Sequence, residues 1–178
     1  MKTTLTIILS IFMSQSILAQ MPSIHNLSIT DIDGKTISLS RFKGKKILFV
    51  NVASECGYTP QYTDLQQLHE KYKDKLVIIG MPCNDFGGQE PGNEAKIKHF
   101  CSSKYHVTFM MASKVNIKSN PISPVYEWLT QKKLNGKEDS DVNWNFNKYL
   151  IDEEGHYIAH YRSGVKPMSE ELISAISK

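Results

Sequence analysis

Two short runs of apolar residues constrain the fold of this chain more than any other feature of its sequence. Residues 46–52 (KILFVNV) and 76–81 (LVIIGM) are almost continuously apolar and rich in β-branched side chains. Runs of this kind are typical of strands covered on both faces, as in parallel sheets. Between them, apolar and aromatic residues recur at helical spacing over residues 62–72. The sequence therefore predicts an α/β layered domain whose sheet is at least partly parallel.

The rest of the chain continues this alternation and predicts a central mixed β-sheet flanked by helices. Residues 27–30 and 36–39 alternate around Asp33-Gly34, a turn dipeptide that predicts an N-terminal β-hairpin. The remaining predictions are helices over 93–104, 121–133 and 168–177, a weaker strand within 109–115, and a closing antiparallel hairpin of 146–151 with 156–161. A chain of 178 residues without internal repeats or long linkers is expected to form one domain.

The first 19 residues have the layout of a cleaved secretory signal peptide. Lys2 supplies a positive start, residues 3–13 are mostly apolar, and Ala19 offers a small residue at the cleavage point. The apolar stretch is shorter than the roughly 20 residues that a membrane-spanning helix needs. A buried N-terminal helix is disfavoured because the segment has no amphipathic spacing. We therefore expect a single domain over residues 20–178, without a membrane anchor, that is secreted or periplasmic.

The charge and the motifs argue against several classes of ligand. The chain has 21 Lys and Arg against 18 Asp and Glu, a net charge of +3 that is too small for an electrostatic grip on nucleic acid. The 6 histidines are scattered without a metal-ligand spacing. Gly87-Gly88 is not followed by the Lys-Ser/Thr pair of a phosphate loop. Neither a metal nor a nucleotide cofactor is expected.

The 3 cysteines indicate chemistry more than disulfide stapling, because structural frameworks in small secreted domains are dense and even-numbered. A structural disulfide with one inert thiol is the alternative. Cys56 follows a predicted central strand and precedes a predicted helix, whose N-terminal N–H groups and dipole favour a thiolate. Thr59 stands where a dithiol redox protein would carry its second cysteine. Disulfide transfer through a C-x-x-C motif is therefore disfavoured.

Four blocks of sequence resemble the glutathione peroxidase family, in the branch that uses cysteine in place of selenocysteine. They occur in family order and extend the resemblance over essentially all of residues 23–178. The resemblance implies a thioredoxin-like fold and the reduction of hydroperoxides by a thiol. The blocks are residues 51–59 (NVASECGYT), 82–92 (PCNDFGGQEPG), 100–101 (FC) with Tyr105 and 107–109 (VTF), and 142–146 (VNWNF).

The same resemblance implies roles for individual residues. Cys56 matches the peroxidatic nucleophile, and Trp144 and Asn145 match the family's hydrogen-bonding partners of the reacting sulfur. An indole N–H and an amide NH₂ are donors, and donors aimed at a developing anion stabilise it. The alternative for Trp144 is a packing role in the core, as for most tryptophans.

Asp85 departs from the family pattern, which usually has glutamine at this position. An ionised carboxylate only accepts hydrogen bonds, and its charge disfavours a nearby thiolate. The flanking residues hold the register too firmly for Gln89 to be a simple replacement. We therefore expect a weaker peroxidase unless Asp85 is turned away, paired or protonated, and the sequence predicts that Asp85→Gln speeds peroxide reduction.

Cys101 matches the resolving cysteine of the thioredoxin-dependent members of the family. A second thiol must condense with a sulfenic acid at Cys56 before further oxidation becomes irreversible. Cys101 lies 45 residues from Cys56 on a predicted helix, which would have to loosen to bring the two sulfurs together. The alternative is a buried helix cysteine that acts as a small hydrophobic residue. Cys83 ends a predicted buried strand and is expected to be inert.

The resulting expectation is a thiol peroxidase for hydrogen peroxide and organic or lipid hydroperoxides. By the resemblance, its reductant is a thioredoxin-like dithiol protein or glutathione, and the short polar segment 134–143 implies a monomer or weak dimer. A peroxide-sensing redox relay is one alternative, which slow turnover with rapid oxidation of a partner would single out. A non-catalytic module, whose chemistry Asp85 has ended, is the other.

Overall fold

The computed structural model describes residues 23–178, so the signal peptide predicted over residues 1–19 lies outside the described part of the chain. Two 3₁₀ turns accompany the helices and strands. In chain order the elements are a 3₁₀ turn (Ile24–Asn26), β1 (Ser28–Thr30), β2 (Thr36–Ser38), a 3₁₀ turn (Leu39–Phe42), β3 (Lys46–Val52), α1 (Gln61–Tyr72), β4 (Leu76–Pro82), α2 (Glu94–Tyr105), β5 (Met110–Met111), α3 (Pro124–Thr130), α4 (Lys132–Asn135), β6 (Lys148–Ile151), β7 (Tyr157–Tyr161) and α5 (Glu170–Ser177).

The main sheet is mixed and has β3 at its centre. Its strand order is β5-β4-β3-β6-β7, with β3, β4 and β5 parallel and with β6 and β7 joined antiparallel. Val52 pairs with Pro82 of β4, and Val50 pairs with Lys148 of β6. The carboxyl ends of β3 and β4 therefore meet the beginning of β6 at one edge of the sheet.

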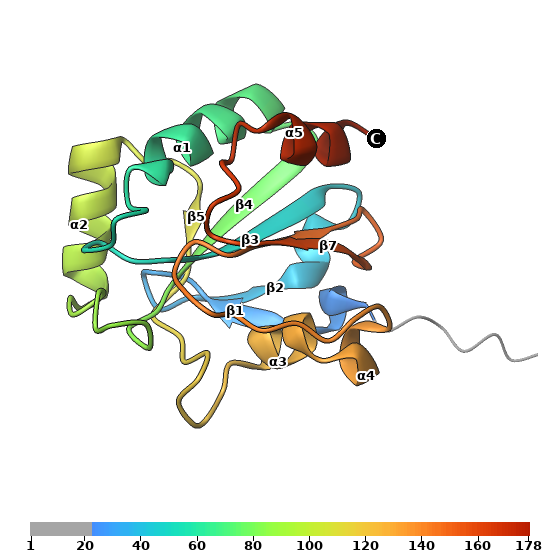
Figure 1. Ribbon diagram of the computed structural model, residues 1–178, viewed down its shortest axis with the longest axis horizontal. Coiled ribbons are helices and arrows are strands. Elements are labelled where there is room, and N and C mark those ends of the chain that lie inside the picture. Colours follow the sequence, from blue (N-terminus) through green and yellow to red (C-terminus); the bar gives the residue numbers. More distant parts are fainter. Residues whose placement is uncertain (1–22) are drawn as a thin grey trace, which may run out of the picture.

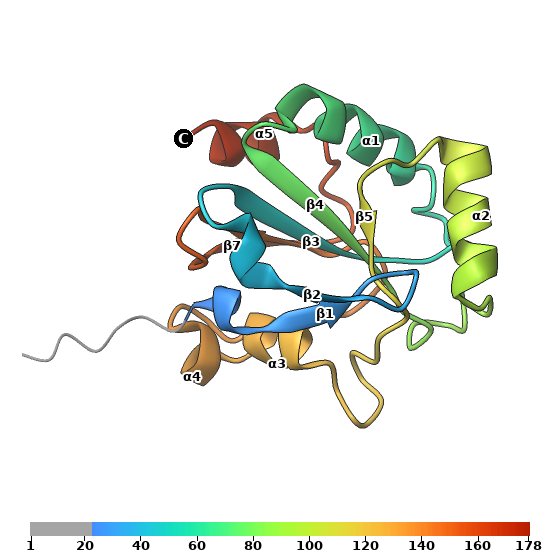
Figure 2. The same cartoon turned by 180° about the vertical axis from the view of Figure 1, so that it is seen from behind.

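Each face of the sheet is covered by a different set of elements. Figure 1 shows α1 and α5 above the sheet, the β1–β2 hairpin with α3 and α4 below it, and α2 at one end beyond β5. Figure 2 shows the same layers from behind, with the hairpin in front. The period-2 geometry of β3 sends Leu48 and Val50 to the first face and Ile47 and Phe49 to the second. The apolar run 46–52 is buried throughout for this reason.

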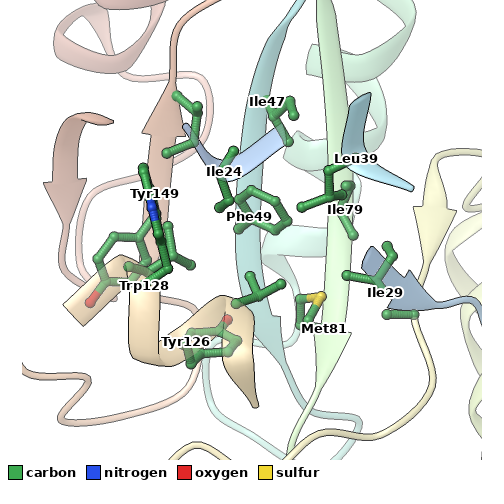
Figure 3. Packing of buried hydrophobic residues seen from close by; sticks show 14 of the residues in the cluster. Ile24, Ile29, Leu39, Ile47, Phe49, Ile79, Met81, Tyr126, Trp128 and Tyr149 are labelled. Atoms are coloured by element: carbon green, nitrogen blue, oxygen red, sulfur yellow. The ribbon is translucent and has the colours of Figure 1, made fainter. Parts of the chain in front are cut away.

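The core on the hairpin side is rich in aromatic residues. Figure 3 shows Phe49 beside Ile79 and Met81 of β4, with Tyr126 and Trp128 of α3 against the sheet. Tyr126 also contacts Tyr149 edge-on, with ring centroids 6.3 Å apart. This side of the sheet packs α3 and the hairpin into one hydrophobic cluster.

The structure differs most from the predicted elements in two places, while β6 and α5 each begin two residues later than predicted. Residues 121–133 form two short helices, because α3 begins only at Pro124, where proline suits the first turn, and Gln131 is extended (φ −113°, ψ 116°). Within the segment 109–115 only Met110–Met111 pairs as a strand.

Over residues 23–178, no helix is long and apolar enough to cross a membrane.

Candidate active site

Cys56 lies in a tight loop between β3 and α1, and its side chain is only 8% exposed. Its backbone N–H donates to the Thr59 hydroxyl oxygen (3.0 Å), and this hydroxyl group donates to the carbonyl oxygen of Ala53 (2.9 Å). The N–H of Tyr58 donates to the Cys56 sulfur at 3.4 Å. Thr59 thus closes the loop at the place where a dithiol protein would have a second sulfur. The sulfur accepts a hydrogen bond from this backbone N–H group.

A second loop carries Trp144 and Asn145 and is held by β3 itself. The Asn51 side chain donates to the carbonyl oxygen of Trp144 (2.9 Å) and accepts from the N–H of Asn147 (2.8 Å). The Phe146 N–H donates to the Asn51 carbonyl oxygen at 2.6 Å. Phe146 has a φ of +62°, an unusual conformation for a bulky residue that the surrounding contacts must enforce. The turn before β6 is therefore fixed against the strand that leads to Cys56.

Sequence reasoning assigned no role to Asn51, although it left a visible signal. Asn51 is a polar residue inside the apolar run 46–52, and in the structure it is fully buried. A buried polar side chain needs hydrogen-bond partners. A lone asparagine in a central strand therefore indicates that its side chain forms hydrogen bonds to a neighbouring segment of the chain.

A third loop, residues 82–92 after β4, joins the other two. The Glu55 N–H donates to the carbonyl oxygen of Gln89 at 3.0 Å. The Asn145 side-chain nitrogen donates to Gln89 Oε1 at 3.0 Å and, at 3.4 Å, to the carbonyl oxygen of Phe86. A Cβ atom on Gly87 would lie 3.3 Å from the Trp144 ring, so this ring packs against the loop.

These contacts bring the loops of Cys56, Trp144 and Asn145 to one edge of the sheet. Among the hydrogen bonds of residues 23–178, none joins the Cys56 sulfur directly to the side chain of Trp144 or Asn145. Trp144 is 38% exposed, which excludes the alternative of a packing role in the hydrophobic core. The candidate site combines a shielded thiol with a solvent-facing indole ring and a buried amide.

Asp85 is turned toward residues 117–119. Its carboxylate accepts hydrogen bonds from the backbone N–H groups of Ile117 (2.6 Å), Lys118 (2.8 Å) and Ser119 (3.3 Å), and from the Ser119 hydroxyl group (2.6 Å). Partial burial alone would raise the pKa of Asp85, but these hydrogen bonds outweigh it and lower the pKa below its ordinary value. Asp85 is thus an ionised clamp for the 117–119 loop.

This orientation reverses the prediction for Asp85→Gln. The longer, neutral side chain loses the charge-assisted hydrogen bonds, so we expect the free energy of unfolding to fall by about 2 kcal/mol, without faster peroxide reduction. Urea unfolding and the rate of thiol oxidation by hydrogen peroxide measure the two effects. An accelerated reaction at unchanged stability would show that Asp85 acts on the Cys56 sulfur instead.

Cys101 lies on the inner side of α2, in the same hydrophobic cluster as Cys56. It is 2% exposed, and both sulfurs are free thiols. Burial raises the pKa of the Cys101 thiol to about 11, the charge of Glu90 adds to this effect, and the Tyr62 hydroxyl group opposes it. In this state Cys101 is a buried thiol on the inner side of α2.

Cys83 is fully buried in the other cluster, on the side of the sheet that packs against the hairpin and α3. Burial raises the pKa of its thiol to about 12, so a thiolate is strongly disfavoured there. In residues 23–178, no group of three or more His, Cys, Asp or Glu side chains is placed to hold a metal ion.

Glu90 is a buried carboxyl group that sequence reasoning did not single out. It is 1% exposed, and neither carboxyl oxygen has a hydrogen-bond partner of normal geometry. It lines a pocket of about 290 Å³ with Glu55 and Lys96 among its neighbours. Burial raises the pKa of Glu90 to about 7, while Ser54 and the charge of Lys114 oppose the rise.

The raised pKa predicts a pH-dependent stability. The folded protein binds the Glu90 proton more tightly than the unfolded chain does. The free energy of unfolding therefore falls as the pH rises from about 4.5 through about 7 and this proton is lost. We expect Glu90→Gln to raise the free energy of unfolding at pH 8 by up to about 3 kcal/mol, with little gain at pH 4. Urea unfolding at the two pH values measures this, and equal changes at both would contradict it.

Several known proteins are similar to this chain over most of its length. A glutathione peroxidase family model matches residues 24–130. The chain is 44% identical over 149 residues to a glutathione peroxidase-like peroxiredoxin of Schizosaccharomyces pombe, covering 83% of this chain and 93% of the relative. It is 39% identical over 164 residues to a hydroperoxy fatty acid reductase of a Synechocystis species, covering 88% and 95%.

The fold comparison gives the same result. The crystal structure of Trgpx in its apo form aligns with a TM-score of 0.66 and 32% identity, over 88% of this chain and 96% of that one. The predicted thioredoxin-like fold, a mixed sheet with flanking helices, is thereby confirmed.

Proposed function

The chain belongs to the glutathione peroxidase family and is a peroxidase, and we propose that it reduces hydroperoxides through a Cys56 thiolate that Cys101 resolves. The observation that carries this proposal is the meeting of the Cys56 loop with the turn that bears Trp144 and Asn145. That turn is held by Asn51 and by a strained Phe146 backbone. Strain that the surrounding structure must enforce is typical of functional sites.

In the proposed first step, the Cys56 thiolate attacks the distal oxygen of the hydroperoxide. The O–O bond breaks, the sulfur becomes a sulfenic acid, and water or an alcohol leaves after taking up a proton. The Tyr58 N–H already faces the sulfur, and the Thr59 hydroxyl group holds the loop in this shape. The indole N–H of Trp144 and the amide of Asn145, on the turn before β6, are the further donors that we propose for this step.

In the second step, the Cys101 thiol condenses with the sulfenic acid, which forms a disulfide and releases water. Cys101 is buried, so α2 has to move first. Of the 12 residues of α2, only Ile97 and Cys101 are buried, and the helix stands at the end of the molecule (Figure 1). This thin attachment supports local opening of α2. An external thioredoxin-like dithiol protein, or glutathione, then reduces the disulfide.

The exposed apolar side chains near the site suit bulky apolar hydroperoxides. Within the described chain, the exposed large hydrophobic side chains are Tyr58 (39%) and Trp144 (38%). Tyr58 follows Cys56 by two residues, and Trp144 lies on the turn that Asn51 of β3 holds. We propose organic and lipid hydroperoxides as substrates besides hydrogen peroxide. A relative named for hydroperoxy fatty acid reduction supports this choice.

Tyr58→Ser tests this substrate preference. The variant keeps the backbone N–H that faces Cys56 but removes apolar contact area, so we expect KM for a fatty acid hydroperoxide to rise roughly fivefold. The rate with hydrogen peroxide should stay the same, because that substrate needs no apolar contact. Gln67→Ser, at an exposed position of α1, is the matched control. Equal losses with both peroxides would contradict the assignment.

We also propose that the protein is exported to the periplasm or the medium after cleavage near Ala19, and that it is a monomer or weak dimer. Mass spectrometry of the exported protein should find Gln20 at its N-terminus, and sedimentation should give a mass near that of one chain. An intact Met1 terminus on the exported protein would contradict the cleavage.

The experiment that tests the proposed activity is the oxidation of the reduced protein by hydroperoxide. We expect Cys56 to lose its thiol at least a hundredfold faster than free cysteine at the same pH, because oriented donors stabilise the departing oxygen. If hydroperoxide oxidises Cys56 no faster than it oxidises free cysteine, Cys56 is not a peroxidatic residue, and the non-catalytic module is favoured.

A further inference from the structure

The carboxyl group of Glu90 borders a pocket between the loop that follows β3 and helix α2. The walls of this pocket of about 290 Å³ include Ser54 from the loop, and Ile97 and Phe100 from α2. The backbone N–H of Glu90 donates to the side-chain oxygen of Asn84 at 2.9 Å, which fixes the main chain at this point. The pocket therefore joins a buried carboxyl group to the first two turns of α2.

This carboxyl group lacks the partners that a buried charge needs. Among residues 23–178, neither oxygen of Glu90 has a hydrogen-bond partner of normal geometry, and the buried hydroxyl group of Ser54 beside it has none either. The charge of Lys114 acts on Glu90, but its Nζ atom donates to the carbonyl oxygen of Gly92 at 3.0 Å. A buried carboxylate without hydrogen bonds is costly, so ionisation of Glu90 favours any state in which water reaches it.

Helix α2, on the other side of the pocket, is only thinly attached to the molecule. Ile97 and Cys101 are its buried residues. Lys98 adds an ion pair with Asp33, but both side chains are exposed, and such pairs contribute little to stability. A Cβ atom on Gly92 would lie 3.5 Å from the Ile97 side chain, so the end of the loop after β4 packs directly on the helix. Water that enters the pocket would disrupt this contact.

Several polar and charged groups surround Glu90 and bear on its ionisation. Burial raises the pKa of the Cys101 thiol to about 11 and raises the pKa of Tyr62 well above its ordinary value, so both groups stay neutral at pH 8. Burial raises the pKa of Glu90 to about 7, into the neutral range. The surrounding groups are Ser54 and Glu55 of the loop after β3, Tyr62 of α1, Lys96 and Cys101 of α2, and Lys114 after β5.

We propose that Glu90 is a positioning residue for the resolving step: when its carboxyl group ionises, water enters the pocket, the contact with the first turns of α2 loosens, and the helix releases Cys101. The inference rests on the proposed role of Cys101 as the resolving thiol. A neutral Glu90 keeps the pocket dry and α2 closed, which protects Cys101. Release of the helix therefore increases as the pH rises through about 7.

Hydrogen–deuterium exchange of the reduced full chain tests this release. Protection factors correct for the intrinsic pH dependence of amide exchange, so they report the opening of the helix. We expect the protection of α2 in the wild type to fall roughly tenfold between pH 5.5 and pH 8, because the open state returns Glu90 to its ordinary pKa. In Glu90→Gln the protection should be equal at both pH values. A wild-type α2 whose protection is independent of pH, or a Glu90→Gln variant that keeps the fall, would overturn the inference.

Glu55→Gln is the matched control, because Glu55 lines the same pocket but is exposed. It removes one negative charge and leaves the buried carboxyl group in place, so α2 should keep the wild-type fall in protection. His99 of α2 is present in all these proteins, and its contribution cancels in the comparison. A loss of the fall in Glu55→Gln as well would assign the effect to surface charge and contradict the role of Glu90.

Glu90→Gln should also slow the resolving step itself. After oxidation with one equivalent of hydrogen peroxide, mass spectrometry follows the conversion of the Cys56 sulfenic acid to the Cys56–Cys101 disulfide. We expect the variant to form this disulfide roughly tenfold more slowly than the wild type at pH 8, and within about twofold of the wild-type rate at pH 5.5, where both proteins carry a neutral side chain. Equal rates at pH 8 would count against the inference.

Ile97→Ala separates release of the helix from a loss of chemistry. It removes one of the two buried contacts of α2 and should lower the protection of this helix at both pH values. Combined with Glu90→Gln, it should restore fast formation of the disulfide, because the helix then opens without the charge. If α2 exchanges freely in the double variant while the disulfide still forms slowly, Glu90 does not act through the helix, and the proposal fails.

The exchange measurement distinguishes this inference from the proposed function, because it uses the reduced protein and needs no peroxide. If hydroperoxide oxidises Cys56 no faster than free cysteine, the proposed function fails, while the protection of α2 still decides whether Glu90 releases the helix. If the peroxidase reaction is fast but α2 responds to pH equally in the wild type and in Glu90→Gln, the proposed function stands and this inference falls.

Discussion

Replacement of Cys56 by serine is expected to abolish hydroperoxide reduction, with a loss of roughly a thousandfold or more. A serine hydroxyl group is a far weaker nucleophile than a thiolate at neutral pH, and it forms no sulfenic acid. Serine is nearly isosteric, and the Thr59 hydroxyl group and the Tyr58 N–H remain to hold the loop. The fold should therefore survive. Coupled turnover with a dithiol reductant and direct peroxide consumption both measure the loss.

Cys83→Ala is the matched control for this substitution. Cys83 is buried in the cluster on the hairpin side, away from the cluster that contains Cys56 and Cys101. Its removal should cost stability through a small cavity but leave the oxidation rate within about twofold. Retained peroxidase activity in Cys56→Ser, or loss of activity in Cys83→Ala, would show that the assignment of the chemistry to Cys56 is wrong.

Replacement of Cys101 by serine is expected to separate the two halves of the reaction. The first oxidation of Cys56 should keep its rate, because Cys101 is buried on the inner side of α2 in the reduced protein. Turnover with a dithiol protein should fall by roughly a hundredfold or more, since the sulfenic acid no longer has a thiol with which to condense. The unresolved sulfur is then exposed to a second peroxide. Mass spectrometry should find a sulfinic acid at Cys56 in the variant and a Cys56–Cys101 disulfide in the wild type.

Cys101→Ala controls for the polarity that serine introduces into the cluster. Both variants should lose turnover to the same extent, although serine should be less stable because its hydroxyl group is buried. Unchanged turnover in both would show that an external thiol resolves Cys56 directly. A wild-type protein that oxidises quickly, turns over slowly and passes its disulfide to a partner would instead support the redox relay.

The strands and helices that position the site follow closely from local patterns. The predicted strand 46–52 is β3 without a change of bounds, and the predicted strand 76–81 is β4 with one further residue. Both are buried on two faces, so apolar residues at every position are a strong signal. The helix predicted over 121–133 is divided at Gln131, where a local break competes with apolar spacing. The two-residue strand β5 has too few pairs to leave a pattern of its own.

Local sequence motifs predict only part of the arrangement of the site. The positions of Cys56, the proposed nucleophile, and of Trp144 and Asn145, its proposed donors, follow from short motifs, because these roles require particular residue types. The direction in which Asp85 points does not follow from any motif. It is decided by the N–H groups of Ile117 and Lys118, which are 32 and 33 residues away in the chain.

The sequence by itself determined the order of strands and helices and the family to which the chain belongs, and it supplied the proposed nucleophile, since periodicity and residue type act over a few neighbouring positions. Only the tertiary structure decided which polar groups meet. Asn51 holds Trp144 across 93 residues, and Gln89 holds Asn145 across 56. A buried amide or carboxylate takes whichever partner the packed fold brings within about 3 Å, and that partner depends on the folding of the whole chain.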